Sequence, residues 1–125
     1  MTESKEAFAQ KLQNGEHAFI VAAQDGVECG LVRYEIAGDT MYFYRLSIKK
    51  DYRRSGFGKR LLIELEREAL RNDVRFIRCK VRLHASAKTY MYQNFGYVQY
   101  AEEIKERDGK PIYVQYLEKR LPVKV

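Results

Sequence analysis

The sequence predicts a mixed α/β (α+β) fold, with a mostly antiparallel central sheet whose third and fourth strands run parallel around a crossover helix. Three strand-like segments joined by short turns come first, followed by a helix, a fourth strand, a second helix and two closing strands, in the order βββ-α-β-α-ββ. Because a helix joins the third strand to the fourth, those two can lie side by side in a right-handed crossover.

The first half of the chain is predicted to form a short helix and then an antiparallel meander. Ser4 is a suitable N-cap for a helix over residues 4–13, and Gly15 can end that helix. Asp25-Gly26 and Gly38-Asp39 are typical of tight turns between strands. The predicted strands cover residues 17–23, 27–37 and 40–48.

The second half alternates helices with strands. Leucines and an alanine recur at helical spacing between Leu61 and Leu70, which predicts a helix over residues 56–72. Apolar and basic residues then alternate as in a strand. The remaining predicted elements are a strand over residues 75–83, a helix over 85–95 that stops at Gly96, and a hairpin of 97–104 and 112–119 around Asp108-Gly109-Lys110-Pro111.

Length and composition predict one folded domain over residues 1–125, since 46% of the residues are hydrophobic and the chain is long enough for one core. No apolar run approaches the roughly 20 residues that span a bilayer, and the polar N-terminus does not resemble a signal peptide. Cys29 and Cys79 lack metal-ligand spacing, so no metal site and a reduced, cytoplasmic location are expected.

The most informative stretch is the glycine-bearing turn of residues 52–62, which lies between the third strand and the first long helix. A helix N-terminus presents unpaired N–H groups and a partial positive charge, and the six lysines and arginines between residues 49 and 60 add full charges, so the turn suits a phosphate or pyrophosphate. An NTPase loop is excluded because Gly58 has no glycine five residues before it, and a dinucleotide fingerprint because Leu61 stands where its third glycine belongs. A plain strand-to-helix turn remains the alternative.

Two motifs together resemble the GNAT superfamily of acetyl-CoA-dependent N-acetyltransferases. Arg53, Gly56 and Gly58 fit the pattern Arg/Gln-x-x-Gly-x-Gly/Ala of its pyrophosphate loop. About 35 residues later, Tyr92 is followed by three residues and then Gly96-Tyr97, as in the superfamily's later helix. The resemblance covers roughly residues 19–118 and implies the acyl-CoA N-acyltransferase fold. The closing hairpin is also similar to the ElaA-like group, although Ile112 stands where that group has a histidine.

The resemblance implies acetyl-CoA as cosubstrate, bound in a cleft between the third and fourth strands. The cofactor-binding residues it implies are Leu46, Ser47 and Ile48 through their main chain along the pantetheine arm, and Arg53, Arg54, Ser55, Gly56, Phe57, Gly58 and Lys59 around the pyrophosphate. The N–H of Ile48 is the expected oxyanion donor. Tyr92 stands where the family has its general acid, while a packing tyrosine is the alternative.

The expected reaction moves an acetyl group from acetyl-CoA to a primary amine of a small molecule, peptide or protein by direct attack, without an acetyl-enzyme. A non-catalytic module that binds coenzyme A or nucleic acid is the alternative. The general base is left open among Glu35, Glu102, Glu103 and His84, and the three glutamates could form an acidic mouth for a cationic amine. No membrane partner is expected, nucleic acid is disfavoured, and an exposed edge strand in the closing hairpin would permit a homodimer.

Overall fold

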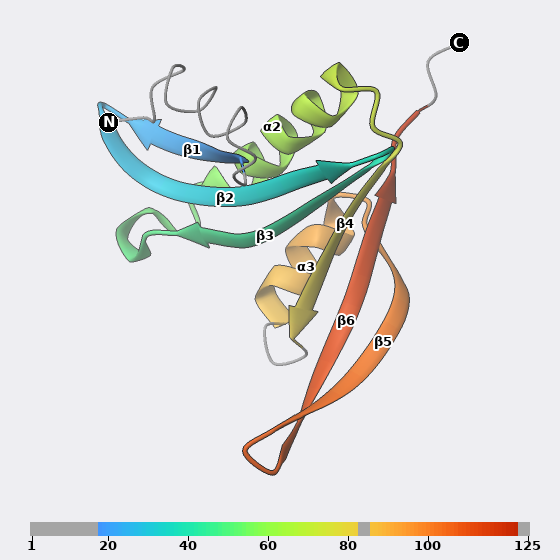
Figure 1. Cartoon of the computed structure of the whole chain (residues 1–125). Coiled ribbons are helices and arrows are strands. Elements are labelled where there is room, and N and C mark those ends of the chain that lie inside the picture. The colour runs from blue at the N-terminus through green and yellow to red at the C-terminus, as the bar shows by residue number, and fades with distance from the viewer. Residues whose placement is uncertain (1–17, 83–85, 123–125) are drawn as a thin grey trace.

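The computed structural model describes residues 18–82 and 86–122, which form one six-stranded sheet and two long helices (Figure 1). The strands are β1 (Ala18–Gln24), β2 (Val27–Ala37), β3 (Thr40–Ile48), β4 (Phe76–Arg82), β5 (Val98–Arg107) and β6 (Lys110–Arg120). The helices are η1 (Lys50–Tyr52), a short 3-10 turn, α2 (Phe57–Arg71) and α3 (Ser86–Asn94). The strand order is β1-β2-β3-β4-β6-β5. The predicted α/β class with its mostly antiparallel sheet is confirmed.

β3 and β4 form the parallel pair, but they pair only where both strands begin. Their register joins Thr40 to Phe76, Met41 to Ile77 and Tyr42 to Arg78, and beyond these residues the two strands diverge (Figure 1). A β-bulge in β3 accompanies the divergence, because its register with β2 shifts and Arg45 has a positive φ of 54°. The sheet therefore opens along its middle toward the carboxyl ends of β3 and β4.

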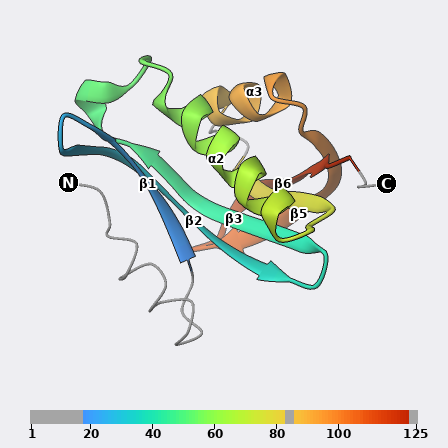
Figure 2. The same ribbon diagram turned by 90° about the horizontal axis from the view of Figure 1, so that it is seen from above.

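Both long helices cover the same face of the sheet, and the core lies between them and the strands (Figure 2). The buried face of α2 places leucines and an alanine against apolar side chains of β2, β3, β4 and β6, as its helical spacing predicts. The fully buried members of this core include Val32, Tyr34, Met41, Leu61, Leu62, Leu65, Ala69, Ile77 and Leu117. Among the described helices, none is both long and apolar enough to cross a membrane.

The closing hairpin is longer than the sequence predicts. Asp108 and Gly109 have φ values of 53° and 77°, as in a two-residue turn of type I′. Because only these two residues form the turn, β6 already begins at Lys110, and Pro111 lies within it opposite Glu106. The turn therefore lies within the predicted stretch, but the strands predicted over residues 97–104 and 112–119 stop short of it.

The other predicted elements agree with the structure to within about two residues at each end, and η1 was not predicted. The predicted helix over residues 4–13, His17 and His84 lie outside the described residues. The predicted exposure of the closing hairpin's edge strand is confirmed, since every residue of β5 is exposed and β5 lies at the edge of the sheet.

We predict that the protein loses thermal stability in alkaline solution. Burial raises the pKa of the Tyr34, Tyr92 and Tyr97 phenols above their ordinary value, and that of the Cys79 thiol to about 12. In the unfolded chain these groups ionise near about 8.5 (thiol) and 10 (phenol). Their neutral forms therefore stabilise the fold at neutral pH, and this contribution is lost as the pH rises from about 9 through the folded pKa values. Thermal melts at pH 7 to 11 should show a falling Tm above about pH 9, whereas a constant Tm to pH 11 would contradict the prediction.

Candidate active site in the cleft between β3 and β4

The divergence of β3 and β4 leaves a cavity of about 200 Å³ between them. One wall is β3, the other is β4, and two side chains of α3 close it from the helical face. The lining residues are Phe43, Tyr44, Arg45 and Leu46 of β3, Cys79, Lys80, Val81 and Arg82 of β4, and Lys88 and Tyr92 of α3. The cleft predicted between the third and fourth strands is therefore present.

The bulged end of β3 turns part of its main chain toward this cleft. The N–H of Lys49 donates to the carbonyl oxygen of Cys29 on β2 at 2.7 Å, so Lys49 faces the neighbouring strand. Main-chain groups alternate along a strand, and those of Ile48 therefore face the other way. Leu46 lies in the bulge and lines the cleft. Ser47 lies two residues before Lys49, so its main-chain groups face β2 as those of Lys49 do. The geometry favours Leu46 and Ile48 over Ser47 as main-chain partners for a molecule in the cleft.

Two cationic side chains already occupy these carbonyl groups. Lys88 donates from Nζ to the carbonyl oxygen of Leu46 at 2.6 Å, and Arg53 donates from Nε to that of Ile48 at 3.1 Å. Burial, and then the positive charge of Arg53, lower the pKa of Lys88, although part of its side chain is exposed. Lys88 is not among the site residues that the sequence predicts. Its position four residues before Tyr92 could have indicated it, because that spacing places both side chains on one face of the helix.

The glycine-bearing turn forms the N-terminus of α2 at the carboxyl end of β3. Gly56 is the N-cap, with a φ of 83° and no side-chain cap, and the first helical bond runs from the N–H of Arg60 to the carbonyl of Gly56 at 3.0 Å. The N–H groups of residues 57–59 thus have no partner within the helix. The first turn holds no acidic residue, and Arg54, Lys59 and Arg60 are exposed there. This arrangement suits a bound pyrophosphate, as the sequence predicts.

Glycine is needed at positions 56 and 58 of the turn for different structural reasons. Gly56 adopts a left-handed conformation, and a Cβ there would meet no other atom within 4 Å, so the space beside it is open. Gly58 is buried, and a Cβ on it would lie 2.9 Å from Sδ of Met91 on α3. Gly58 therefore allows α2 and α3 to approach, in addition to any contact with a ligand.

Tyr92 lies at the inner end of the cleft and is only 3% exposed. Its ring packs edge-on against Phe43 at 5.5 Å between centroids and also contacts Tyr97. Burial, and to a lesser extent the neighbouring Cys79, raise the pKa of its hydroxyl, which therefore keeps its proton at neutral pH. Tyr90, two residues earlier, is 70% exposed and is not part of the core.

The candidate general bases do not gather at the cleft. Glu35 lies on β2 opposite Tyr42, and successive residues of β5 place Glu102 and Glu103 on opposite faces of the sheet. The carboxylate of Glu103 accepts a hydrogen bond from the hydroxyl of Tyr116 at 2.6 Å. None of the three glutamates lines the cavity, so the structure does not form the acidic mouth that they suggested.

Comparisons with known proteins agree with this arrangement. Residues 2–114 match the family model described as an acetyltransferase (GNAT) domain, and the chain therefore belongs to the GNAT acetyltransferase family. No curated protein sequence matches the chain significantly.

Solved structures of the same fold include three acetyltransferases. The ribosomal-protein-S18-alanine N-acetyltransferase of Escherichia coli has a TM-score of 0.80 at 18% identity, with 98% of this chain and 80% of that chain covered. The ribosomal-protein-alanine N-acetyltransferase of Brucella melitensis gives 0.77 at 17% identity, covering 93% and 75%. A GNAT family acetyltransferase of Elizabethkingia anophelis, solved with acetyl-CoA bound, gives 0.74 at 16% identity, covering 94% and 84%. At these identities the likeness establishes the fold alone.

Proposed function

We propose that the protein is an acetyl-CoA-dependent N-acetyltransferase that transfers the acetyl group to a primary amine by direct attack. The observation that carries the proposal is the cleft itself. The diverging strands leave a cavity lined by β3, β4 and the buried Tyr92 of α3, and the glycine-bearing N-terminus of α2 follows β3 in the chain after the short turn η1. Membership of the GNAT acetyltransferase family supports the same reading.

The residues of the cleft fit the two polar parts of acetyl-CoA. Main-chain N–H groups between Arg54 and Lys59 would hold the pyrophosphate, with the side chains of Arg53 and Arg54 adding charge. The main chain of Leu46 and Ile48 would pair with the amide groups of the pantetheine arm, as a neighbouring strand would. Arg53 also ties the loop to Ile48, so the same residue positions both parts of the site.

Two groups of the chain would take part in the transfer itself, and a third residue, Cys79, would not. The N–H of Ile48, on the side of β3 away from β2, would donate to the carbonyl oxygen of the thioester as the amine nitrogen attacks its carbon. Tyr92 holds a proton that can pass to the sulfur as the carbon–sulfur bond breaks. Cys79 is a poor nucleophile, because burial raises the pKa of its thiol to about 12 and keeps it protonated.

Burial acts on the proton donor and on the leaving group in the same direction. The raised pKa of Tyr92 makes it a weaker acid than tyrosine in water. A thiolate released against the same apolar walls would also be more basic than in water, because burial penalises its charge. Burial would thus partly offset the weaker acidity of Tyr92.

Calorimetric titration with acetyl-CoA tests the proposal, with adenosine diphosphate and duplex DNA at matched salt as controls. We expect one acetyl-CoA to bind per chain. Adenosine diphosphate should bind with a higher Kd, and DNA should show no saturable binding. DNA binding in the absence of acetyl-CoA binding would contradict the proposal and favour a nucleic-acid module. Its affinity would then fall steeply with salt.

Replacing Lys88 with methionine should strengthen acetyl-CoA binding. The pantetheine arm and the Lys88 ammonium compete for the carbonyl oxygen of Leu46, and methionine removes the competitor while retaining most of the side chain's volume. Loss of one charge-assisted hydrogen bond corresponds to a Kd lower by about tenfold. Calorimetry measures the change, with Arg67→Met on the exposed side of α2 as the control for the loss of one positive charge. A higher Kd in Lys88→Met would show that Lys88 helps to hold the cofactor.

A further inference from the structure

A second cavity, of about 380 Å³, lies beside the cleft where the β5–β6 hairpin extends past the end of β4. Its lining residues are Lys80, Val81 and Arg82 of β4, Lys105, Glu106 and Arg107 of β5, and Ile112 and Val114 of β6. Lys80, Val81 and Arg82 also line the cleft between β3 and β4, so the two cavities adjoin along the last residues of β4.

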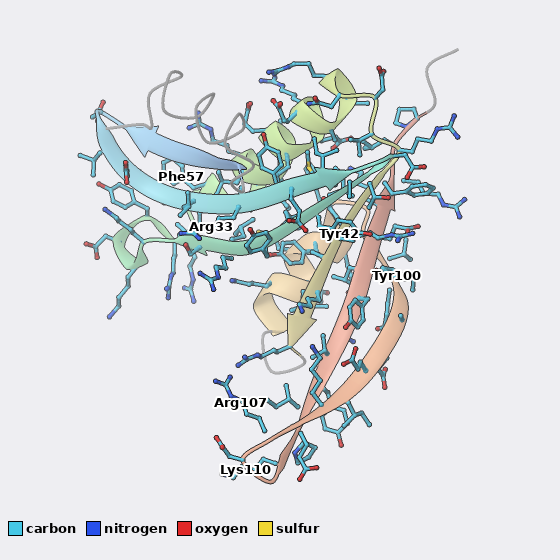
Figure 3. The ribbon with its side chains drawn as sticks, viewed as in Figure 1. Arg33, Tyr42, Phe57, Tyr100, Arg107 and Lys110 are labelled. Carbon is cyan, nitrogen blue, oxygen red and sulfur yellow. The ribbon has the colours of Figure 1, made fainter. Side chains whose placement is uncertain are left out.

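The register of the strands gathers four cations at this cavity. Arg82 lies opposite Val114 and Lys105 lies opposite Ile112, while Lys80 and Arg107 each follow two residues away on the same strands. Because side chains alternate along a strand, all four project from the face of the sheet that α2 and α3 leave uncovered. Figure 3 shows Arg107 and Lys110 at the far end of the hairpin.

The described residues balance only part of the positive charge in this cavity. Elsewhere in the described chain, cations such as Arg67, Arg78 and Lys119 form ion pairs with glutamates. Arg82 and Arg107 form no ion pair with any described residue. The carboxylates nearby are Glu106 in the lining and Glu103, which contacts Lys105 at 3.7 Å but is also held by Tyr116. Cations held together without partners repel one another and attract an anion.

We infer that this cavity is the acceptor subsite, and that it binds the carboxylate or phosphate of an amine substrate that carries such a group. The inference rests on the proposed acetyl transfer, because it places the substrate's amine in the adjoining cleft. Arg82 and Arg107 present planar guanidinium groups that can each hold two oxygens of the anion. Ile112 and Val114 provide an apolar wall for the carbon chain between the anion and the amine. An acceptor of this kind is the opposite of the cationic amine that an acidic mouth would select.

The anion site can be tested without acetyl-CoA. Inorganic phosphate is titrated at constant ionic strength into the full chain, and the Nε–Hε signals of the arginines are followed by NMR. We expect saturable shifts of Arg82 and Arg107 that Arg67 does not share, and in Arg82→Gln the shift of the remaining Arg107 signal should no longer saturate. Shifts that do not saturate, or that Arg67 shares equally, would overturn the subsite. Since this readout needs no acetyl-CoA, a failure of the proposed enzyme activity is distinguished from a failure of the anion site.

A second experiment links the anion site to the reaction and separates the two sources of anion. Acetylation rates are compared within matched pairs, β-alanine against β-alaninamide and phosphoethanolamine against ethanolamine. We expect the charged member of at least one pair to react faster, and its advantage to fall by about tenfold in Arg82→Gln/Arg107→Gln but not in Arg67→Gln. A faster neutral member in both pairs, or an advantage that the double variant leaves unchanged, would overturn the assignment.

Discussion

Replacing Tyr92 with phenylalanine should lower kcat by about 100-fold or more while leaving the Kd for acetyl-CoA almost unchanged, since a positioned general acid contributes on the order of 10²–10⁴. The ring remains, so its edge-on contact with Phe43 and the wall of the cleft are retained. Only the proton that would go to the leaving sulfur is lost. An assay of thiol release measures kcat, and calorimetry measures the Kd for acetyl-CoA separately.

Tyr97 provides a matched control for this substitution. Its ring is also buried and contacts both Phe43 and Tyr92, but Tyr97 is not among the residues that line the cleft. Its buried hydroxyl has no hydrogen-bond partner among the residues that the structure describes. Tyr97→Phe should therefore retain kcat and should not lower the free energy of unfolding. Equal losses of kcat in the two variants would mean that the aromatic cluster, rather than the Tyr92 proton, is what the reaction needs.

Replacing Gly56 with glutamate should abolish measurable acetyl-CoA binding. The residue caps α2 next to the unpaired N–H groups of residues 57–59, and the open space beside it is where the pyrophosphate would lie. A glutamate fills that space and brings a negative charge toward the phosphates. It also strains the left-handed backbone by about 1 kcal/mol, which is small beside the stability of a typical domain. Calorimetry with acetyl-CoA, after a thermal melt to verify folding, gives the result.

Gly38→Glu is the control for this variant. It introduces the same backbone strain and the same charge at a position away from the predicted pyrophosphate site. Gly38 also has a positive φ, of 61°, and a Cβ on it would meet no atom within 4 Å. It lies in the turn before β3, at the opposite end of that strand from the glycine loop. This variant should bind acetyl-CoA as the native protein does. Normal binding by Gly56→Glu would show that the loop is not where the pyrophosphate lies.

The architecture was predictable because local patterns and the global fold agree. The alternation of apolar residues in β2 and β4, the helical spacing in α2, and the Asp-Gly turns each specify one structure independently of the others. The glycine loop and Tyr92 were found because their motifs are local in sequence. Each of these features depends on a short window of residues.

The details of the cleft depend on contacts between distant segments, so the sequence did not reveal them. The bulge at Arg45 places a non-glycine residue at a positive φ, which no local preference predicts. The bond between Lys88 and Leu46 joins residues 42 positions apart. The cationic cavity needs the register of β4, β6 and β5 to bring two alternating basic pairs together. The alternation of basic residues at positions 80 and 82 and at positions 105 and 107 is visible in the sequence. The sequence does not show that these two pairs lie side by side, because that depends on how the strands pair.

The brief contact between β3 and β4 has a consequence for how the sheet moves. Among the described residues, three residue pairs join β3 to β4, so the sheet consists of two three-stranded halves connected near one end. Such a joint resists shear along the strands less than a full ladder of hydrogen bonds would. A ligand lying along Leu46 and Ile48 would bridge the gap between the two halves of the sheet. It would make hydrogen bonds that β3 and β4 do not make with each other. Substrate binding would then also strengthen the connection between the two halves of the sheet.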